Sequence, residues 1–158
     1  MKLLFVCTGN ICRSPTAQGI MEDMIENAGL DITCDSAGTY GLHAGEPPDQ
    51  RAIKIASEHG IDISRYRARQ IEDEDFEYYD IIFALDDGHL QAMKAQKPTG
   101  ARAQLKLFAK DADVPDPWYG EEDGFHQTYD MIARAAESVF AEHCQISGDI
   151  PNDKESAS

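Results

Sequence analysis

The sequence contains no long hydrophobic segment. Its apolar N-terminal run, MKLLFV, is too short for a secretory signal, and no small-residue cleavage pattern follows it. No later stretch approaches the roughly 18 consecutive apolar residues of a membrane-spanning helix. We therefore expect a cytoplasmic protein with no membrane partner.

Basic and aromatic residues are also scarce. Lysine and arginine total 14 against 29 aspartates and glutamates, which gives a formal net charge of −15. Such a charge repels nucleic acids and anionic membranes, so no nucleic-acid partner is expected. A phosphorylated ligand would need a local cluster of donors to bind against this field. Aromatic residues make up 8% of the chain, so the core should be mainly aliphatic.

Patterns that bind metals are missing. The cysteines form no CxxC pair and the five histidines show no HExxH spacing, and these are common spacings of zinc sites. We expect no metal and no cofactor. In a reducing compartment the four cysteines would start as free thiols. They are Cys7, Cys12, Cys34 and Cys144.

The sequence does contain a fourfold alternation of short apolar runs and amphipathic segments. Strands are expected over residues 2–6, 32–34, 80–85 and 104–108, and helices over 15–28, 48–59, 87–96 and 125–143. This order predicts an α/β fold, a single domain with a four-stranded parallel sheet and helices on both faces, of the flavodoxin-like doubly wound type. The domain should span residues 1–146. Residues 147–158 have no apolar face and are expected to form a disordered tail.

The segment CTGNICRSP, residues 7–15, joins the first expected strand to the first expected helix. Ligands of doubly wound sheets bind beyond the carboxyl ends of the strands, which is where Cys7 falls. Gly9 and Asn10 readily adopt positive φ angles, and successive amides in such a turn form a concave anion site. We call residues 7–14 the anion loop.

Neighbouring residues favour nucleophilic chemistry at Cys7. Arg13 can present a planar guanidinium to two oxygens of a tetrahedral anion, and Ser14 is an expected helix N-cap whose hydroxyl can support the sulfur. A helix N-terminus and a guanidinium both favour the thiolate, the form that attacks phosphorus. The alternative is a small buried hydrophobe at a strand end. The combination of strand, cysteine, turn and arginine favours catalysis.

With these residues the chain resembles the low-molecular-weight protein tyrosine phosphatases. The family signature Cys-x5-Arg-Ser matches Cys7, Arg13 and Ser14, and its Asp-Pro-aromatic-aromatic loop matches DPWY at residues 116–119. The resemblance implies that phosphotyrosine is hydrolysed through a phosphocysteine, with Asp116 as general acid and then base. The implied catalytic residues are Cys7, Arg13 and Asp116, and the implied phosphate-binding residues are Thr8, Gly9, Asn10, Ile11, Cys12 and Ser14.

The resemblance also assigns residues around the anion loop. The expected walls for a flat phosphotyrosine side chain are Tyr40, Trp118 and Tyr119. The residues expected to orient the loop are Ser36, His59 and Asp86. His59 could equally cap a helix C-terminus. Ile11 stands where relatives acting on phosphoarginine carry threonine, which favours phosphotyrosine.

Cys12 implies a redox role. An oxidised Cys7 could be captured by Cys12 as a disulfide, which would make inhibition by oxidation reversible. Otherwise Cys12 is a buried loop residue. The expected partners are phosphotyrosine-containing proteins, with a tyrosine kinase among the candidates, and inorganic phosphate or another oxyanion in the active site.

Two other functions stay open. An arsenate reductase of the same fold would use a similar loop but needs further cysteines to relay a disulfide outward, and Cys34 and Cys144 are far apart in the sequence. A non-catalytic phosphotyrosine-binding or redox-sensing module would bind its ligand without turnover.

Overall fold

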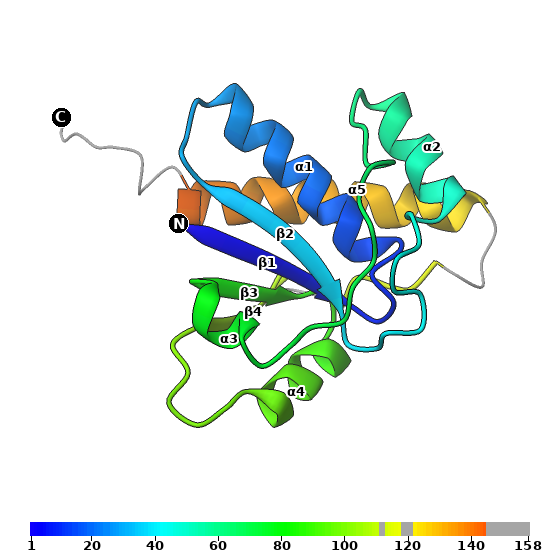
Figure 1. Ribbon diagram of the computed structural model, residues 1–158. Coiled ribbons are helices and arrows are strands. Elements are labelled where there is room, and N and C mark those ends of the chain that lie inside the picture. Colours follow the sequence, from blue (N-terminus) through cyan, green and yellow to red (C-terminus); the bar gives the residue numbers. More distant parts are fainter. Residues whose placement is uncertain (111–112, 118–121, 145–158) are drawn as a thin grey trace, which may run out of the picture.

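The computed structural model describes residues 1–110, 113–117 and 122–144, and within them a sheet of four parallel strands (Figure 1). The strands lie in the order β2-β1-β3-β4. Their bounds are β1 Lys2–Cys7, β2 Thr33–Gly38, β3 Ile81–Ala84 and β4 Gln104–Leu107. The predicted four-stranded parallel sheet is confirmed.

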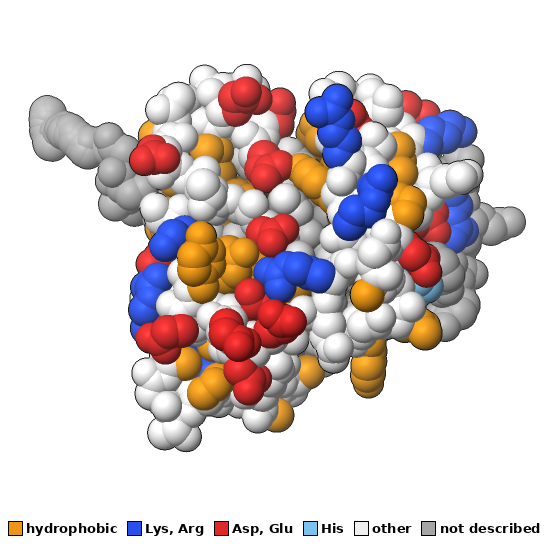
Figure 2. Space-filling view, viewed as in Figure 1, with side chains coloured by type: hydrophobic (Ala, Val, Ile, Leu, Met, Phe, Trp, Pro, Cys, Tyr) orange, Lys and Arg blue, Asp and Glu red, His pale blue; other side chains and the backbone are white. Residues whose placement is uncertain are grey.

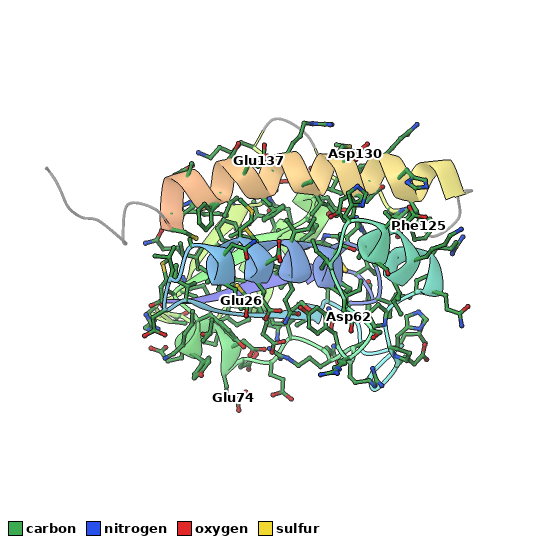
Figure 3. The ribbon with its side chains drawn as sticks, turned by 90° about the horizontal axis from the view of Figure 1, so that it is seen from above. Glu26, Asp62, Glu74, Phe125, Asp130 and Glu137 are labelled. Atoms are coloured by element: carbon green, nitrogen blue, oxygen red, sulfur yellow. The ribbon has the colours of Figure 1, made fainter. Side chains whose placement is uncertain are left out.

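Helices cover both faces of this sheet (Figure 1). On one face lie α1 (Arg13–Asn27), α2 (Gln50–Glu58) and α5 (Glu122–Val139), which continues into the π-helical turn η1 (Phe140–Cys144). On the other lie the one-turn helix α3 (Asp75–Tyr78) and α4 (Asp87–Gln96). Figure 3 shows α1 and α5 side by side, with Phe125 at the end of α5 nearest α2.

The alternation of side chains along β1 builds the two cores. Successive strand residues point to opposite faces of a sheet. Leu3 and Phe5 therefore pack with α1, α2 and α5, whereas Leu4 and Val6 pack with α3 and α4. All four side chains are fully buried, as expected for a central parallel strand covered on both faces.

The start of α1 differs from the prediction. The helix begins at Arg13, and its N-cap residue Cys12 makes no side-chain capping hydrogen bond. The prediction that Ser14 caps the helix is wrong, because Ser14 lies inside the first turn and its hydroxyl contacts the anion loop. Beyond its C-terminus lies Gly29, whose φ of +68° is the left-handed conformation common after helix ends.

Other differences concern strand lengths and short elements. β2 runs four residues beyond its expected end, to Gly38, and the one-turn helix α3 and the π-helical turn were not predicted. The expected tail, residues 147–158, lies outside the described residues. No helix within the described ranges is long and apolar enough to span a membrane.

Candidate active site

The anion loop leaves the carboxyl end of β1, between β2 and β3. Asn10 adopts a φ of +60° and is the one non-glycine residue with positive φ in the described part of the chain. Positive φ was also expected at Gly9, but Gly9 does not adopt it. The left-handed conformation in the turn is therefore that of Asn10. A side chain on Gly38 would lie 2.6 Å from the carbonyl oxygen of Thr8, so a glycine lets β2 approach the loop closely.

A buried hydrogen-bond network fixes the sulfur of Cys7. The Cys7 Sγ lies 3.0 Å from the hydroxyl oxygen of Ser14 and 3.4 Å from the Ser14 amide nitrogen. The Asn10 side-chain amide donates to Ser14 Oγ at 2.8 Å and to Ser36 Oγ at 3.0 Å. Ser36 in turn donates to Gln18 Oε1 at 2.7 Å. Cys7, Asn10, Ser14 and Ser36 are all buried, so this network holds the loop without help from solvent.

Arg13 is buried beside the sulfur, and most of its donors are occupied. Its Nη1 donates to Asp86 Oδ2 at 2.9 Å and to the Val114 carbonyl oxygen at 3.1 Å. Its Nη2 lies 3.4 Å from Asp116 Oδ2. The Nε is buried and has no hydrogen-bond partner among the described residues. Because a buried donor without a partner is costly, this N–H is suited to an oxygen of a bound anion.

Two hydrogen bonds tie the segment that carries Asp116 to the rest of the fold. The Val114 amide donates to the Leu85 carbonyl oxygen at 3.0 Å, which ties the segment to the end of β3. The Thr128 hydroxyl donates to the Pro115 carbonyl oxygen at 3.4 Å, which ties it to α5. The Asp116 side chain is 39% exposed. It can therefore exchange protons with solvent while facing Arg13.

Cys7, Arg13 and Asp116 line one cavity of about 520 Å³. The remaining lining residues are Thr8, Gly9, Ile11, Cys12, Tyr40, Gly41, Leu42 and His43. Tyr40, an expected wall, is 66% exposed. Leu42 is 82% exposed, and both it and His43 were missed by the sequence analysis. No sequence pattern marks them, because they reach the cavity through the pairing of residue 40 with the loop, in which the Tyr40 amide donates to the Thr8 carbonyl oxygen at 3.0 Å.

The expected supporting residues divide into two groups. Ser36 and Asp86 contact Asn10 and Arg13, as described above. His59 lies at the C-cap of α2, where its Nδ1 is 3.0 Å from the Ile55 carbonyl oxygen and its ring stacks on Tyr129 at 4.2 Å. This is the helix-capping position that the sequence had left open. Trp118 and Tyr119, the other expected walls, lie outside the described residues.

Two residues that the sequence analysis missed complete the support of Asn10. Gln18 accepts from Ser36, and the backbone amide of Arg69 donates to Asn10 Oδ1 at 3.0 Å. These residues are 8 and 59 positions beyond Asn10 in the chain. Only the packing of α1 and of the segment after α2 against β2 brings them together.

The anion loop belongs to a strongly acidic protein, whose formal net charge is −15. Figure 2 shows acidic side chains gathered over α3, and the exposed ones there are Glu72, Asp73, Glu74 and Glu77. Binding of an anion therefore depends on the local donors of the loop and on Arg13. Within the described ranges, no group of three or more histidine, cysteine, aspartate or glutamate side chains is arranged to hold a metal ion.

Comparison with known proteins agrees with the resemblance that the sequence motifs indicated. Residues 2–147 match the family model described as low molecular weight phosphotyrosine protein phosphatase. A low molecular weight protein-tyrosine-phosphatase of Streptomyces coelicolor is 39% identical over 151 residues, covering 89% of this chain and 92% of that protein.

Solved structures match as well. A protein tyrosine phosphatase of Entamoeba histolytica, crystallised with Hepes in the active site, superposes with a TM-score of 0.85 at 36% identity. The superposition covers 90% of this chain and 96% of the Entamoeba chain. An arginine phosphatase of Drosophila superposes with a TM-score of 0.86 at 28% identity. This superposition covers 92% of this chain and 99% of the Drosophila chain.

Proposed function

The chain belongs to the low molecular weight phosphotyrosine protein phosphatase family, and from that premise we propose that it hydrolyses phosphotyrosine through a phosphocysteine formed on Cys7. The observation that carries the proposal is that Cys7, Arg13 and Asp116 line the same cavity. A nucleophile, a cation and a proton donor then face one bound phosphate.

In the first step the Cys7 thiolate attacks phosphorus and the bond to the tyrosine oxygen breaks. The Ser14 hydroxyl, 3.0 Å from the sulfur, and the Ser14 amide, 3.4 Å away, both support a negative charge on Cys7. The unpartnered Nε of Arg13 and the loop amides would bind the equatorial oxygens of the phosphoryl group. Asp116 donates its proton to the departing phenolate.

In the second step water replaces the sulfur. Asp116, now a carboxylate, removes a proton from water, which attacks phosphorus and breaks the bond to Cys7. The products are phosphate and the free thiolate, and Asp116 carries a proton again. The partial exposure of Asp116 supports this role, because water can reach its carboxylate.

The depth of the cavity supports phosphotyrosine as the substrate. The sulfur lies at the buried end of the cavity, since Cys7 is 2% exposed, whereas Tyr40 and Leu42 at the cavity wall are largely exposed. A long, flat side chain reaches the sulfur between such walls, whereas phosphoserine is shorter. Ile11 lines the cavity and adds apolar surface.

We further propose that oxidation inhibits the enzyme reversibly. Cys7 and Cys12 line the same cavity. Peroxide would oxidise the Cys7 thiolate to a sulfenic acid, and attack by the Cys12 sulfur would form the disulfide with loss of water. Burial and the neighbouring Cys7 raise the pKa of Cys12, so capture should be faster at higher pH. Because Cys7 must be reduced to attack phosphorus, and the cytoplasm keeps thiols reduced, this proposal includes a cytoplasmic location.

Turnover of p-nitrophenyl phosphate tests the function. Cys7→Ser should abolish turnover, and acid quenching of the wild-type reaction should trap a phosphoryl group on Cys7, detectable by mass spectrometry. Cys34→Ser is the matched control and should keep wild-type turnover, because Cys34 lies in β2 outside the cavity. Hydrolysis retained in Cys7→Ser would overturn the proposal.

The general acid needs its own test. Asp116→Asn should lower kcat by about 10² to 10⁴-fold, the usual contribution of general acid catalysis. The loss should be larger for phenyl phosphate than for p-nitrophenyl phosphate, because phenolate needs the proton more. Asp62→Asn, on an exposed turn, is the control and should leave turnover unchanged. Equal losses for both substrates would contradict the assignment of Asp116.

Substrate comparisons separate the remaining functions. Phosphotyrosine peptides should be hydrolysed faster than phosphoserine peptides or phosphoarginine, the last being included because a structural neighbour is an arginine phosphatase. Arsenate reduction coupled to thioredoxin should be absent, in wild type as in Cys34→Ser. A binding module would retain phosphotyrosine peptides without releasing phosphate.

A further inference from the structure

His89 is a buried polar residue that the mechanism above does not use. It lies in the first turn of α4 and is 5% exposed. Its Nε2 is 2.8 Å from the Thr8 hydroxyl oxygen and 3.4 Å from Arg13 Nη2. Its ring therefore touches both the anion loop and the arginine that faces the phosphate.

The neighbours of His89 determine its protonation state. A guanidinium can only donate, so the Nε2 that faces Arg13 must be an acceptor, and the ring proton then resides on Nδ1. That Nδ1 lies 3.1 Å from Asp86 Oδ1, within electrostatic reach but without hydrogen-bond alignment. Burial and the charge of Arg13 lower the pKa of His89 to about 4, against the opposing effect of Asp86. The imidazole is thus neutral at neutral pH.

Thr8 links the two side chains. Arg13 Nη2 donates to Thr8 Oγ1 at 3.3 Å, and the Thr8 hydroxyl proton is then directed to His89 Nε2. The amide of His89 donates to Asp86 Oδ1 at 2.9 Å, while the other oxygen of Asp86 accepts from Arg13 Nη1. The contacts form a closed circuit around the guanidinium, passing through Thr8, His89 and Asp86.

We propose that His89 is a positioning residue, whose neutral imidazole accepts at Nε2 and thereby fixes the plane of the Arg13 guanidinium, leaving Nε available to the phosphate. The ion pair with Asp86 holds one end of the guanidinium, and the contacts with Thr8 and His89 hold the other. A planar group held at both ends cannot rotate away from the transferring phosphoryl group. This inference rests on the proposed function, because it assigns Arg13 to phosphate binding.

Two substitutions separate positioning from simple packing. His89→Leu fills much of the same buried space but accepts no hydrogen bond, whereas His89→Gln retains an acceptor oxygen. With p-nitrophenyl phosphate, His89→Leu should lower kcat by about tenfold or more, with a smaller change in KM, because Arg13 acts most strongly in the transition state. His89→Gln should recover most of that loss. Met93→Ala, a buried substitution in the same helix, controls for loss of stability and should keep kcat at 25 °C.

Because Thr8 links Arg13 to His89, the effects of substitutions at Thr8 and His89 on kcat should not add. Thr8→Val removes the hydroxyl but retains the side-chain shape, so it should lower kcat in the same direction as His89→Leu. The double variant should lose little beyond His89→Leu alone, because both changes break one circuit. Fully additive losses would overturn the circuit. Equal kcat in His89→Leu, His89→Gln and wild type would overturn the positioning role.

Phosphate binding distinguishes failure of this inference from failure of the proposed function. In a Cys7→Ser background, calorimetric titration with inorganic phosphate measures the anion site without chemistry. His89→Leu should weaken phosphate binding severalfold and His89→Gln should not. That result would support positioning of Arg13 even if the wild-type protein released no phosphate from phosphotyrosine. Unchanged phosphate binding in His89→Leu, in a protein that does hydrolyse phosphotyrosine, would overturn this inference alone.

Discussion

Replacing Asn10 by alanine should destabilise the protein by about 4 kcal/mol. The side chain makes three hydrogen bonds, with the Ser14 and Ser36 hydroxyls and the Arg69 amide, and each is worth about 1 kcal/mol net. Alanine at a φ of +60° adds about 1 to 2 kcal/mol of backbone strain. For a chain of this size, the total corresponds to a fall in Tm of about 8 to 16 °C.

Urea unfolding followed by far-UV circular dichroism measures this change. Asn10→Gly is the matched variant, since it loses the same hydrogen bonds but tolerates positive φ, and it should cost about 3 kcal/mol. Both variants should also lose phosphatase activity, because the loop would no longer be held around Cys7. A loss of less than about 1 kcal/mol in Asn10→Ala would refute the view that Asn10 anchors the loop.

Three further predictions follow from local geometry. Gly38→Ala should destabilise the protein by about 1 to 3 kcal/mol and lower turnover, because the new Cβ would lie 2.6 Å from a carbonyl oxygen of the anion loop; unchanged urea unfolding would contradict this. Burial opposes ionisation of Asp49, but hydrogen bonds from Arg51 outweigh it and hold the pKa of Asp49 below its ordinary value. Asp49→Ala should therefore cost about 1 kcal/mol at pH 7, as a lost N-cap, and the difference from wild type should shrink as the pH falls below about 4; a constant difference in unfolding free energy between pH 7 and pH 3 would exclude that coupling. Cys12→Ser should retain turnover but lose recovery by added thiol after peroxide treatment, and normal recovery would remove the redox role of Cys12.

The sequence predicted the fold well because local patterns decide most of it. Apolar runs such as DIIFAL mark strands buried on both faces, and β3 forms inside that run, at Ile81–Ala84. Amphipathic spacing located α2 and α4 to within two residues of their ends. The bounds of β2 were predicted less well, because TCDSAG is weakly apolar and its pairing with β1 defines the strand.

Among the site residues, those close together in the sequence were predicted well, whereas a role that depends on tertiary contacts was not. Cys7, Arg13 and Ser14 belong to one contiguous loop, so their proximity is a consequence of the short chain that connects them. The expected N-cap of α1 was wrong: Ser14 contributes to the sulfur network in place of capping the helix, because tertiary contacts with Cys7 and Asn10 outweigh its local preference.

By itself, the sequence determined the strand-loop-helix unit that carries Cys7 and Arg13, because hydrophobic periodicity and turn chemistry act over a few residues. Only the tertiary structure decided which distant residues surround it: Gln18 and Arg69 around Asn10, Leu42 and His43 at the cavity wall, and His89 against Thr8. These contacts arise when parallel strands bring their carboxyl ends to one edge of the sheet. That juxtaposition depends on strand order and on the packing of loops against one another, and neither leaves a periodic signal along the chain.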